Sequence, residues 1–166
     1  MIKCILFDRD GTLGNLVDKR YPQSLIPYCD IAYVFNKIKE KGYHVGVITN
    51  QSSIARKTAG NYDFNAEKTR WAAEVYEICP HDTKDNCDCR KPKSGLLYSA
   101  CKKLNLLPSE CIVVGDRLSD LLCASNAGAK AILVLTGYGA EEKEKCLEKF
   151  PNLTILNQFD EILNLI

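Results

Sequence analysis

The sequence lacks a hydrophobic run long enough to cross a bilayer, which takes about 20 consecutive apolar residues. It also lacks an excess of charge of either sign: 22 Lys and Arg stand against 21 Asp and Glu, for a net charge of +1. We therefore expect neither a nucleic acid nor a membrane as a partner. The first apolar run ends at Asp8, well short of a signal peptide with its small-residue cleavage site, so a cytoplasmic location is the expectation.

Internal repeats, low-complexity segments and linker-like stretches are also missing. With 166 residues, the chain has the size of one domain, so we expect a single domain over residues 1–166. No Gly-x-x-x-x-Gly-Lys-Ser/Thr loop is present, which argues against a nucleotide kinase.

Short apolar runs alternate with amphipathic stretches along the whole chain. The expected strands are residues 3–7, 44–48, 75–78, 111–114, 131–135 and 153–155. The expected helices are residues 30–41, 65–73, 94–104, 118–127, 140–150 and 158–165. Strands that alternate with helices predict an α/β fold, a doubly wound parallel sheet covered on both faces. Ligands of such sheets bind beyond the carboxyl ends of the strands.

Polar residues stand where three of the apolar runs stop. Asp8 follows the first strand, Thr49 the second and Asp116 the fourth. Each Asp-Gly or Gly-Asp pair alone is also a common turn. However, Asp8 and Asp10 on one tight loop repel each other unless a cation intervenes, and Mg²⁺ prefers such oxygen ligands. We therefore predict a Mg²⁺ site formed by Asp8, Asp10 and Asp116.

The chain has nine cysteines, an odd number that fits reduced thiols and a metal site better than a disulfide framework. Three of them lie close to a histidine, and the set predicts a structural Zn²⁺ site with all four positions filled by Cys79, His81, Cys87 and Cys89. The alternative without a metal is a set of free thiols beside a surface histidine. An iron site or a redox role fits these four residues less naturally than zinc. The loop over residues 79–89 is too short and polar to fold by burial alone, so the metal would order it.

The motifs in their order resemble those of the haloacid dehalogenase-like phosphatases over essentially the whole chain. They are Asp8-Arg9-Asp10-Gly11-Thr12, Thr49-Asn50-Gln51, Lys91 and Gly115-Asp116 followed by Asp120. The resemblance implies that Asp8 attacks phosphorus and becomes an aspartyl phosphate, while Asp10 protonates the leaving group and then activates water. The residues expected to bind the phosphate or the rest of the substrate are Thr49, Asn50, Gln51, Ser52, Arg90 and Lys91.

The zinc loop narrows the resemblance to a subgroup without a large cap domain. Cys79-Pro80-His81 followed by Cys87-Asp88-Cys89-Arg90-Lys91-Pro92 is similar to the heptose 1,7-bisphosphate 7-phosphatases and to histidinol-phosphate phosphatases. The stretches 49–56 and 135–139 favour the heptose group, in which the arginine contributes to substrate recognition and the lysine stabilises the phosphoryl group. The five-residue gap between His81 and Cys87 favours the histidinol group.

Several alternatives stay open. Ser53 stands where the heptose group has glycine, and residues 57–78 look too short for the long helix expected there. A non-catalytic phosphate-binding protein of the same fold is the alternative from another class. Asp120 is expected either to lie near the metal ion or to orient Lys91. Whether Lys93 shares the phosphate site with Lys91 also stays open. Trp71 is expected to pack against the sheet, with substrate stacking as the second reading.

Overall fold

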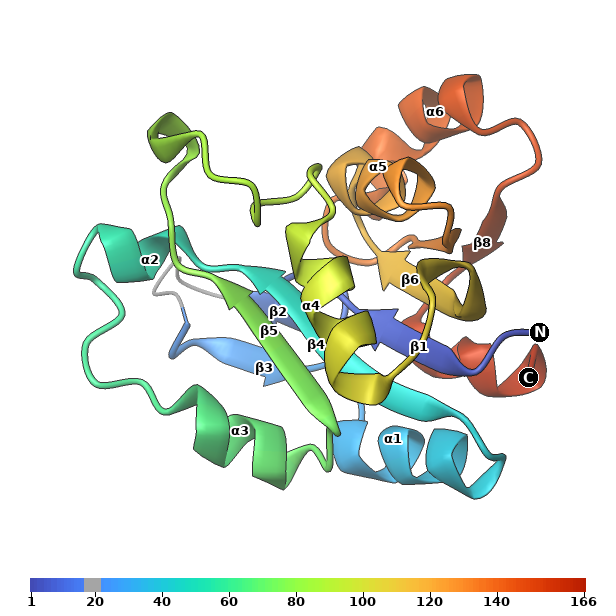
Figure 1. Ribbon diagram of the computed structural model, residues 1–166, viewed down its shortest axis with the longest axis horizontal. Coiled ribbons are helices and arrows are strands. Elements are labelled where there is room, and N and C mark those ends of the chain that lie inside the picture. Colours follow the sequence, from blue (N-terminus) through green and yellow to red (C-terminus); the bar gives the residue numbers. More distant parts are fainter. Residues whose placement is uncertain (17–21) are drawn as a thin grey trace.

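The computed structural model describes residues 1–16 and 22–166, and its centre is a six-stranded sheet with helices packed on both sides (Figure 1). The strand order is β5-β4-β1-β6-β7-β8, and every neighbouring pair is parallel. The strands are β1 (Cys4–Phe7), β4 (His44–Asn50), β5 (Val75–Cys79), β6 (Cys111–Gly115), β7 (Lys130–Val134) and β8 (Thr154–Leu156). The predicted doubly wound α/β fold is therefore confirmed.

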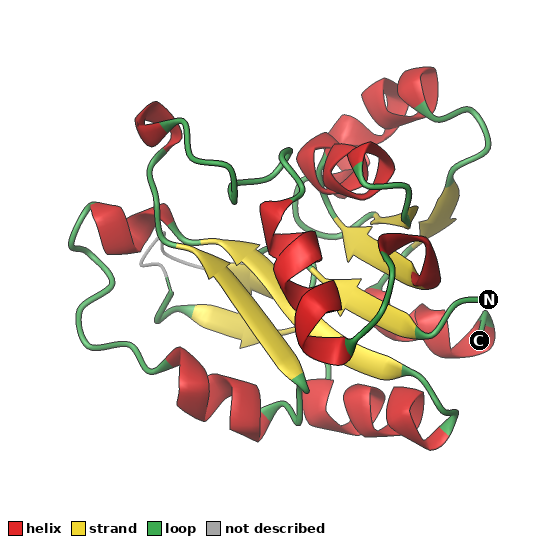
Figure 2. Ribbon diagram, viewed as in Figure 1, coloured by secondary structure: helices red, strands yellow, loops and turns green. Residues whose placement is uncertain are grey.

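Figure 2 shows the helices that connect and cover these strands. The α-helices are α1 (Ile31–Glu40), α2 (Ser52–Ala55), α3 (Phe64–Arg70), α4 (Gly95–Leu104), α5 (Leu118–Asn126) and α6 (Gly139–Lys149). Three 3₁₀ helices are η1 (Thr83–Asp85), η2 (Pro108–Glu110) and η3 (Phe159–Asn164). None of the helices in the described part of the chain is long and apolar enough to span a bilayer.

The period-two alternation of the strands divides the core between the two faces of the sheet. On β1, Ile5 and Phe7 lie in the cluster that includes the apolar face of α1 and the buried residues of η3. Cys4 and Leu6 point the other way, into the cluster with α4 and α5. Trp71 is 5% exposed within the first cluster, so its packing role is confirmed.

The strand order decides where polar side chains meet. The chain leaves β1 toward β4 and β5 on one side, and returns to the other side at β6, so the direction of winding reverses between β1 and β6. A crevice forms at such a switch point beyond the carboxyl ends of the strands. Asp8 follows β1 and Asp116 follows β6, and Phe7 pairs with Val114 in the ladder.

The structure differs from the expectations in several places. An antiparallel hairpin of β2 (Gly14–Leu16) and β3 (Leu25–Pro27) was not predicted, because three-residue strands are too short to show a periodicity. The helix expected over residues 158–165 is the 3₁₀ helix η3, whose buried Phe159 and Ile162 stand three residues apart, a spacing that fits 3.0 residues per turn. The second strand continues through Asn50, so Thr49 lies inside β4 and not beyond its end.

Candidate active site

Three buried carboxylates meet at the switch point. Asp8 is 7% exposed, Asp116 is fully buried, and Asp120, from the first turn of α5, is 2% exposed. One oxygen atom of each lies within 4.8 Å of those of the other two. The structure thus brings together two of the three predicted Mg²⁺ ligands and adds Asp120 to them.

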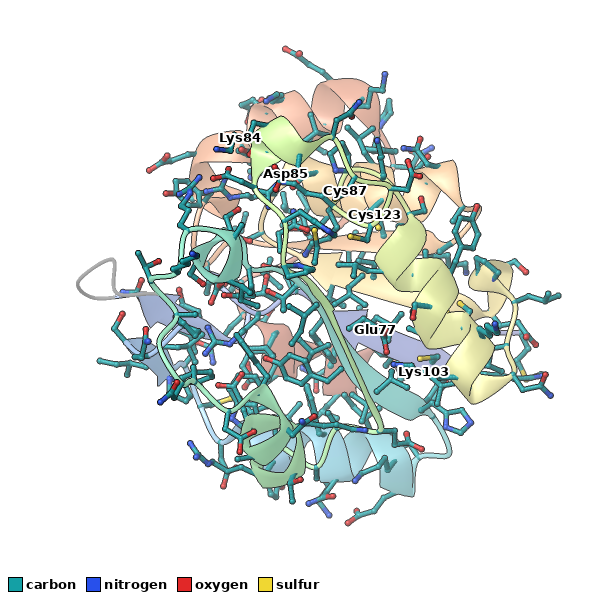
Figure 3. All side chains as sticks on the ribbon, turned by 60° about the vertical axis from the view of Figure 1, so that its left-hand side comes forward. Glu77, Lys84, Asp85, Cys87, Lys103 and Cys123 are labelled. Carbon is teal, nitrogen blue, oxygen red and sulfur yellow. The ribbon has the colours of Figure 1, made fainter. Side chains whose placement is uncertain are left out.

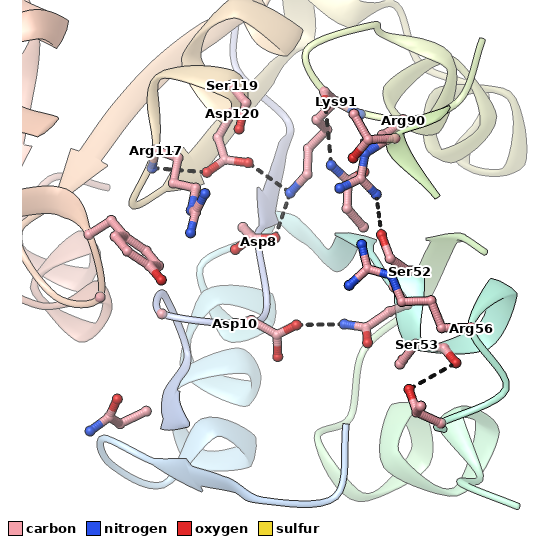
Figure 4. Close-up of a pocket in the computed structure, with 18 of the residues that line it drawn as sticks. Asp8, Asp10, Ser52, Ser53, Arg56, Arg90, Lys91, Arg117, Ser119 and Asp120 are labelled. Carbon is pink, nitrogen blue, oxygen red and sulfur yellow. Dashed lines mark hydrogen bonds and ion pairs between the residues drawn. The ribbon is translucent and has the colours of Figure 1, made fainter. Parts of the chain in front are cut away.

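Lys91 inserts its ammonium group between Asp8 and Asp120, as Figure 4 shows. Its Nζ lies 2.5 Å from Asp8 Oδ1 and 2.7 Å from Asp120 Oδ1, and donates to the carbonyl oxygen of Ile48 at 2.9 Å. Asp120 therefore orients Lys91 by direct contact. Lys93 is instead exposed and bonds to Asn86, away from the carboxylates.

The charges in this buried group do not balance, because one ammonium faces three carboxyls. Burial raises the pKa of Asp8 well above its usual value, and burial together with Asp120 raises the pKa of Asp116 to about 7. Burial opposes the charge of Lys91, but Asp120 and Asp8 outweigh it and raise the pKa of Lys91. A hard divalent cation would relieve this excess negative charge, so the donor set fits Mg²⁺.

The response of stability to Mg²⁺ should depend on pH. A carboxyl whose pKa is raised by folding stabilises the protein fully below its unfolded pKa, and this contribution is lost as the pH rises through its folded pKa. For Asp116 that window runs from 3.8 to about 7. We therefore expect added Mg²⁺ to raise Tm more at pH 8 than at pH 5, because it replaces the lost protons. Thermal melts at both pH values test this, and an equal shift at each would contradict it.

Close backbone approach holds Asp116 in place. Gly11 has a φ of +90° and Gly137 a φ of +55°, and a Cβ on either would collide with Asp116 Oδ2. The backbone N–H of Tyr138 donates to the same oxygen at 2.8 Å. The glycines of the Asp10-Gly11 and Gly137-Tyr138 pairs are therefore required by the geometry around the carboxylate.

Asp10 is held apart from the three carboxylates. Arg9 Nη1 lies 2.5 Å from its Oδ1, and Gln51 Nε2 donates to its Oδ2 at 2.7 Å. Burial raises the pKa of Asp10, although Arg9 counteracts this. A raised pKa suits a group that must carry a proton near neutral pH. Its role as a Mg²⁺ ligand remains a prediction.

The predicted phosphate-binding residues divide into two groups. Gln51, Ser52, Arg90 and Lys91 line the pocket with Asn50, whereas Thr49 is fully buried and accepts a hydrogen bond from Gln51 Nε2 at 2.9 Å. The amide of Asn50 accepts from the backbone N–H of Lys91 and donates to the Lys91 carbonyl, at 3.0 and 3.1 Å. In this arrangement Asn50 fixes the backbone that presents the lysine.

The carboxylates open into a polar pocket of about 1180 Å³ (Figure 4). Arg90, on one wall, donates to Ser52 Oγ at 2.8 Å and to the His81 carbonyl at 3.2 Å. Sequence reasoning missed Arg56, Arg117 and Tyr138, which also line it. Arg56 lies within the matched stretch 49–56, so that motif was the signal for it. Arg117 stacks on the ring of Tyr138, a contact between residues that only folding brings together.

The four predicted zinc ligands converge beside this pocket. Their ligand atoms all lie within 4.8 Å of one another. Neighbouring pairs are 3.2–3.6 Å apart, namely Cys79–His81, Cys79–Cys87, Cys87–Cys89 and His81–Cys89. A tetrahedral Zn²⁺ with Zn–S bonds of about 2.3 Å separates its sulfur ligands by roughly 3.8 Å, so the cluster has close to the right size for zinc.

The zinc loop also supports the pocket. Asp82 caps the 3₁₀ helix η1 of this loop, and its carboxylate accepts hydrogen bonds of 2.7 and 2.9 Å from the guanidinium of Arg56. Figure 3 shows Lys84, Asp85 and Cys87 together in this loop. Arg90 and Lys91 follow Cys89 directly, so an ordered loop delivers both cations to the pocket.

Replacing Cys87 with serine tests the zinc site. We expect bound zinc to fall from about one ion per chain toward none, because three remaining ligands hold the ion less tightly, and Tm to fall because metal binding is coupled to folding of the loop. Elemental analysis and thermal melts measure the two effects. Cys29→Ser, a half-buried thiol outside the cluster, is the control. Full zinc content in Cys87→Ser would contradict the assignment.

Comparison with known proteins agrees with this geometry. A family model described as HAD-hydrolase-like matches residues 88–162. The D-glycero-beta-D-manno-heptose-1,7-bisphosphate 7-phosphatase of Haemophilus ducreyi is 36% identical over 156 residues, covering 81% of this chain and 84% of the relative. The enzyme of the same name from Neisseria meningitidis serogroup A is 34% identical over 174 residues, with 98% and 92% covered.

A solved structure is also similar to this chain over nearly the whole length of both. The D,D-heptose 1,7-bisphosphate phosphatase from B. bronchiseptica, crystallised with magnesium and phosphate, has a TM-score of 0.83 and 25% identity, with 99% of this chain and 97% of that one covered. The resemblance drawn from the motifs is thereby confirmed. This chain belongs to the HAD-like phosphatases, in the family that includes the heptose 1,7-bisphosphate 7-phosphatases.

Proposed function

We propose that this chain is a Mg²⁺-dependent phosphomonoester hydrolase that removes the 7-phosphate of a D-glycero-D-manno-heptose 1,7-bisphosphate through an aspartyl-phosphate intermediate on Asp8. The observation that carries the proposal is the placement of Asp8 in a cation-lined pocket, against Lys91 Nζ at 2.5 Å. The 36% identity to an enzyme named for this reaction supports the choice of substrate.

The reaction proceeds in two steps. A carboxylate oxygen of Asp8 attacks phosphorus, and the bond from phosphorus to the sugar oxygen breaks while Asp10 gives its proton to that oxygen. Asp10 then takes a proton from water as the water oxygen attacks phosphorus, which releases phosphate and restores Asp8. Lys91 lies against Asp8 and offers positive charge to the phosphoryl oxygens.

Two metal ions complete the proposal. Asp8 and Asp116, with Asp120 beside them and Asp10 as a further predicted ligand, would hold Mg²⁺, which supplies positive charge to the phosphoryl group when bound. Zn²⁺ would be held by Cys79, His81, Cys87 and Cys89. With all four of its positions filled by protein, that ion has a structural role.

The pocket suits a substrate with a second phosphate. Arg56 is paired with Asp82, which neutralises it. Arg90 instead donates to two neutral oxygens, those of Ser52 and the His81 carbonyl, and keeps its charge for an anion. We assign Arg90 to recognition of the part of the substrate that carries the phosphate left in place.

A phosphate-release assay with a panel of substrates tests the proposal. We expect the highest kcat/KM for the heptose bisphosphate, and Mg²⁺ dependence throughout. Preference for histidinol phosphate would overturn the substrate but keep the chemistry. No release from any sugar phosphate or from histidinol phosphate would overturn the enzyme itself and favour a phosphate-binding role.

We also propose that the chain acts in the cytoplasm as one phosphatase domain. None of its nine cysteines, all of which lie in the described residues, forms a disulfide, a state that a reducing compartment maintains.

A further inference from the structure

Arg9, which stands between the two acids of the first motif, is fully buried and has no part in the reaction as described so far. Its guanidinium makes a two-pronged contact with Glu67, from Nε to Oε1 at 2.8 Å and from Nη2 to Oε2 at 2.9 Å. Its remaining nitrogen, Nη1, lies 2.5 Å from Asp10 Oδ1. Nη2 also donates to the Pro22 carbonyl at 2.8 Å. One planar side chain therefore links the proposed acid/base to a carboxylate 58 residues further along the chain.

Glu67 is held as firmly as the arginine. It is 2% exposed on α3, and its two oxygens also accept hydrogen bonds from the hydroxyls of Tyr76 and Tyr62. Tyr76 OH lies 2.5 Å from Oε1. Both carboxylate oxygens thus receive an arginine N–H and a tyrosine O–H, which leaves Glu67 little freedom to move.

Aromatic rings enclose the guanidinium. Its carbon lies 5.5 Å from the ring centre of Tyr62, 5.9 Å from that of Phe64 and 5.8 Å from that of Trp71. These distances fall within the range of cation–π contacts. All three rings belong to residues 62–71, within the stretch that looked too short for a long helix. The segment therefore has a specific arrangement around Arg9.

Fold stability alone is a poor explanation of this network. Removing charged groups from water is costly, and buried ion pairs often stabilise a fold no better than apolar side chains of similar size. The network instead terminates on Asp10. Arg9 holds Oδ1, while Oδ2 faces Gln51 and the pocket. A carboxyl fixed at one oxygen presents the other in a defined direction, which proton transfer to a leaving group requires.

We propose that Arg9 is a positioning residue for Asp10, and that Glu67 with its two tyrosines holds Arg9 in place. The inference rests on the proposed role of Asp10 as the group that protonates the leaving oxygen. Lysine cannot replace Arg9, because one ammonium group cannot make the paired contact to both oxygens of Glu67 and reach Asp10 Oδ1 at the same time. The segment from Tyr62 to Tyr76 thereby determines where the acid points.

The dependence of the rate on the leaving group tests the proposal. An alkyl phosphate needs a proton on its leaving oxygen, whereas p-nitrophenyl phosphate releases a stable anion without one. Misplacing Asp10 should therefore slow the alkyl substrate more. We expect Arg9→Lys and Arg9→Met to lower the ratio of kcat/KM for an alkyl phosphate over p-nitrophenyl phosphate by at least about 10-fold, and Asp10→Asn to lower it by roughly 100-fold or more.

Glu67→Gln is the second variant, and Glu77→Gln is its matched control. Glu77 lies on β5, near Lys103 in Figure 3, and is not among the residues that line the pocket. It is 7% exposed and accepts hydrogen bonds from Lys103 and Ser99. We expect the substrate ratio to fall in Glu67→Gln and to stay at the wild-type value in Glu77→Gln. If the Arg9 variants lower the rates for both substrates by one common factor, or lower neither, the proposal is overturned.

Removal of Arg9 alone leaves Glu67 buried without its partner, an uncompensated charge that opposes folding. The double variant Arg9→Met with Glu67→Gln avoids that uncompensated charge and is judged by the same ratio. Circular dichroism and thermal melts identify the folded variants. A wild-type protein without activity on either substrate would count against the proposed function, while an active wild type with unchanged ratios in the variants would count against this inference alone.

Discussion

Asp8→Asn is expected to lower kcat for phosphate release by about 10⁴-fold or more, because an amide has no carboxylate oxygen to attack phosphorus. The change keeps the size of the side chain, so it leaves no cavity in the buried site. Rapid-quench experiments should trap a phosphoryl group on the wild-type protein and none on the variant. Together these measurements separate covalent catalysis from direct attack by water.

Asp160→Asn is the control for this substitution. Asp160 lies on η3 and accepts a hydrogen bond from Gln158, far along the chain from the carboxylate cluster, and asparagine keeps an acceptor there. Its activity should equal that of the wild type. An Asp8→Asn variant that hydrolyses as fast as the parent would refute the role of Asp8 and revive a phosphate-binding protein as the better description.

Lys91→Met should have the second largest effect, and it should reduce both rate and stability. The ammonium lies against Asp8 and Asp120 at 2.5 and 2.7 Å, and its side chain is 2% exposed. Its loss leaves three buried carboxyls without a protein cation, which typically costs roughly 3–5 kcal/mol of unfolding free energy. We expect kcat/KM to fall by about 10³-fold as well, because the phosphoryl oxygens lose a fixed positive charge.

Mg²⁺ gives this prediction a second measurement. Because the ion would take over the neutralisation of the carboxylates, it should restore more of the unfolding free energy in Lys91→Met than it adds to the wild type. Lys93→Met is the matched control: Lys93 belongs to the same basic stretch but is exposed and bonds to Asn86. If Lys93→Met lost as much activity as Lys91→Met, the assignment of the phosphate site to Lys91 and not to Lys93 would be contradicted.

Local patterns were sufficient for much of the fold and for the four residues proposed as zinc ligands. Helix α1 is an example: Asp30 caps it, Ile31, Val34, Phe35 and Ile38 form its buried face, and Gly42 follows with a φ of +88°. All of those signals lie within one short stretch of sequence, residues 30–42. The zinc ligands were equally visible, because Cys-x-His and Cys-x-Cys pairs stand only five residues apart.

The contacts within the candidate active site could not be predicted from local sequence patterns. That Asn50 would bind the backbone of Lys91 depends on which loop packs against β4. Thr49 was expected beyond a strand end and lies buried within β4. Such errors arise because a strand's end, and the neighbour it receives, are determined by pairing with other strands and not by the residues alone.

The sequence by itself determined which groups the candidate site contains: an acid after the first strand, a second acid two residues on, a third after the fourth strand, and a cysteine- and histidine-containing loop before a lysine. Only the tertiary structure decided how these groups act on one another. Strand order placed Asp8 beside Asp116, and folding carried Glu67 across 58 residues to Arg9 and so to Asp10. The physical reason is that hydrogen bonds and charge interactions act over a few ångströms, and no local pattern records which distant residues folding will bring within that range.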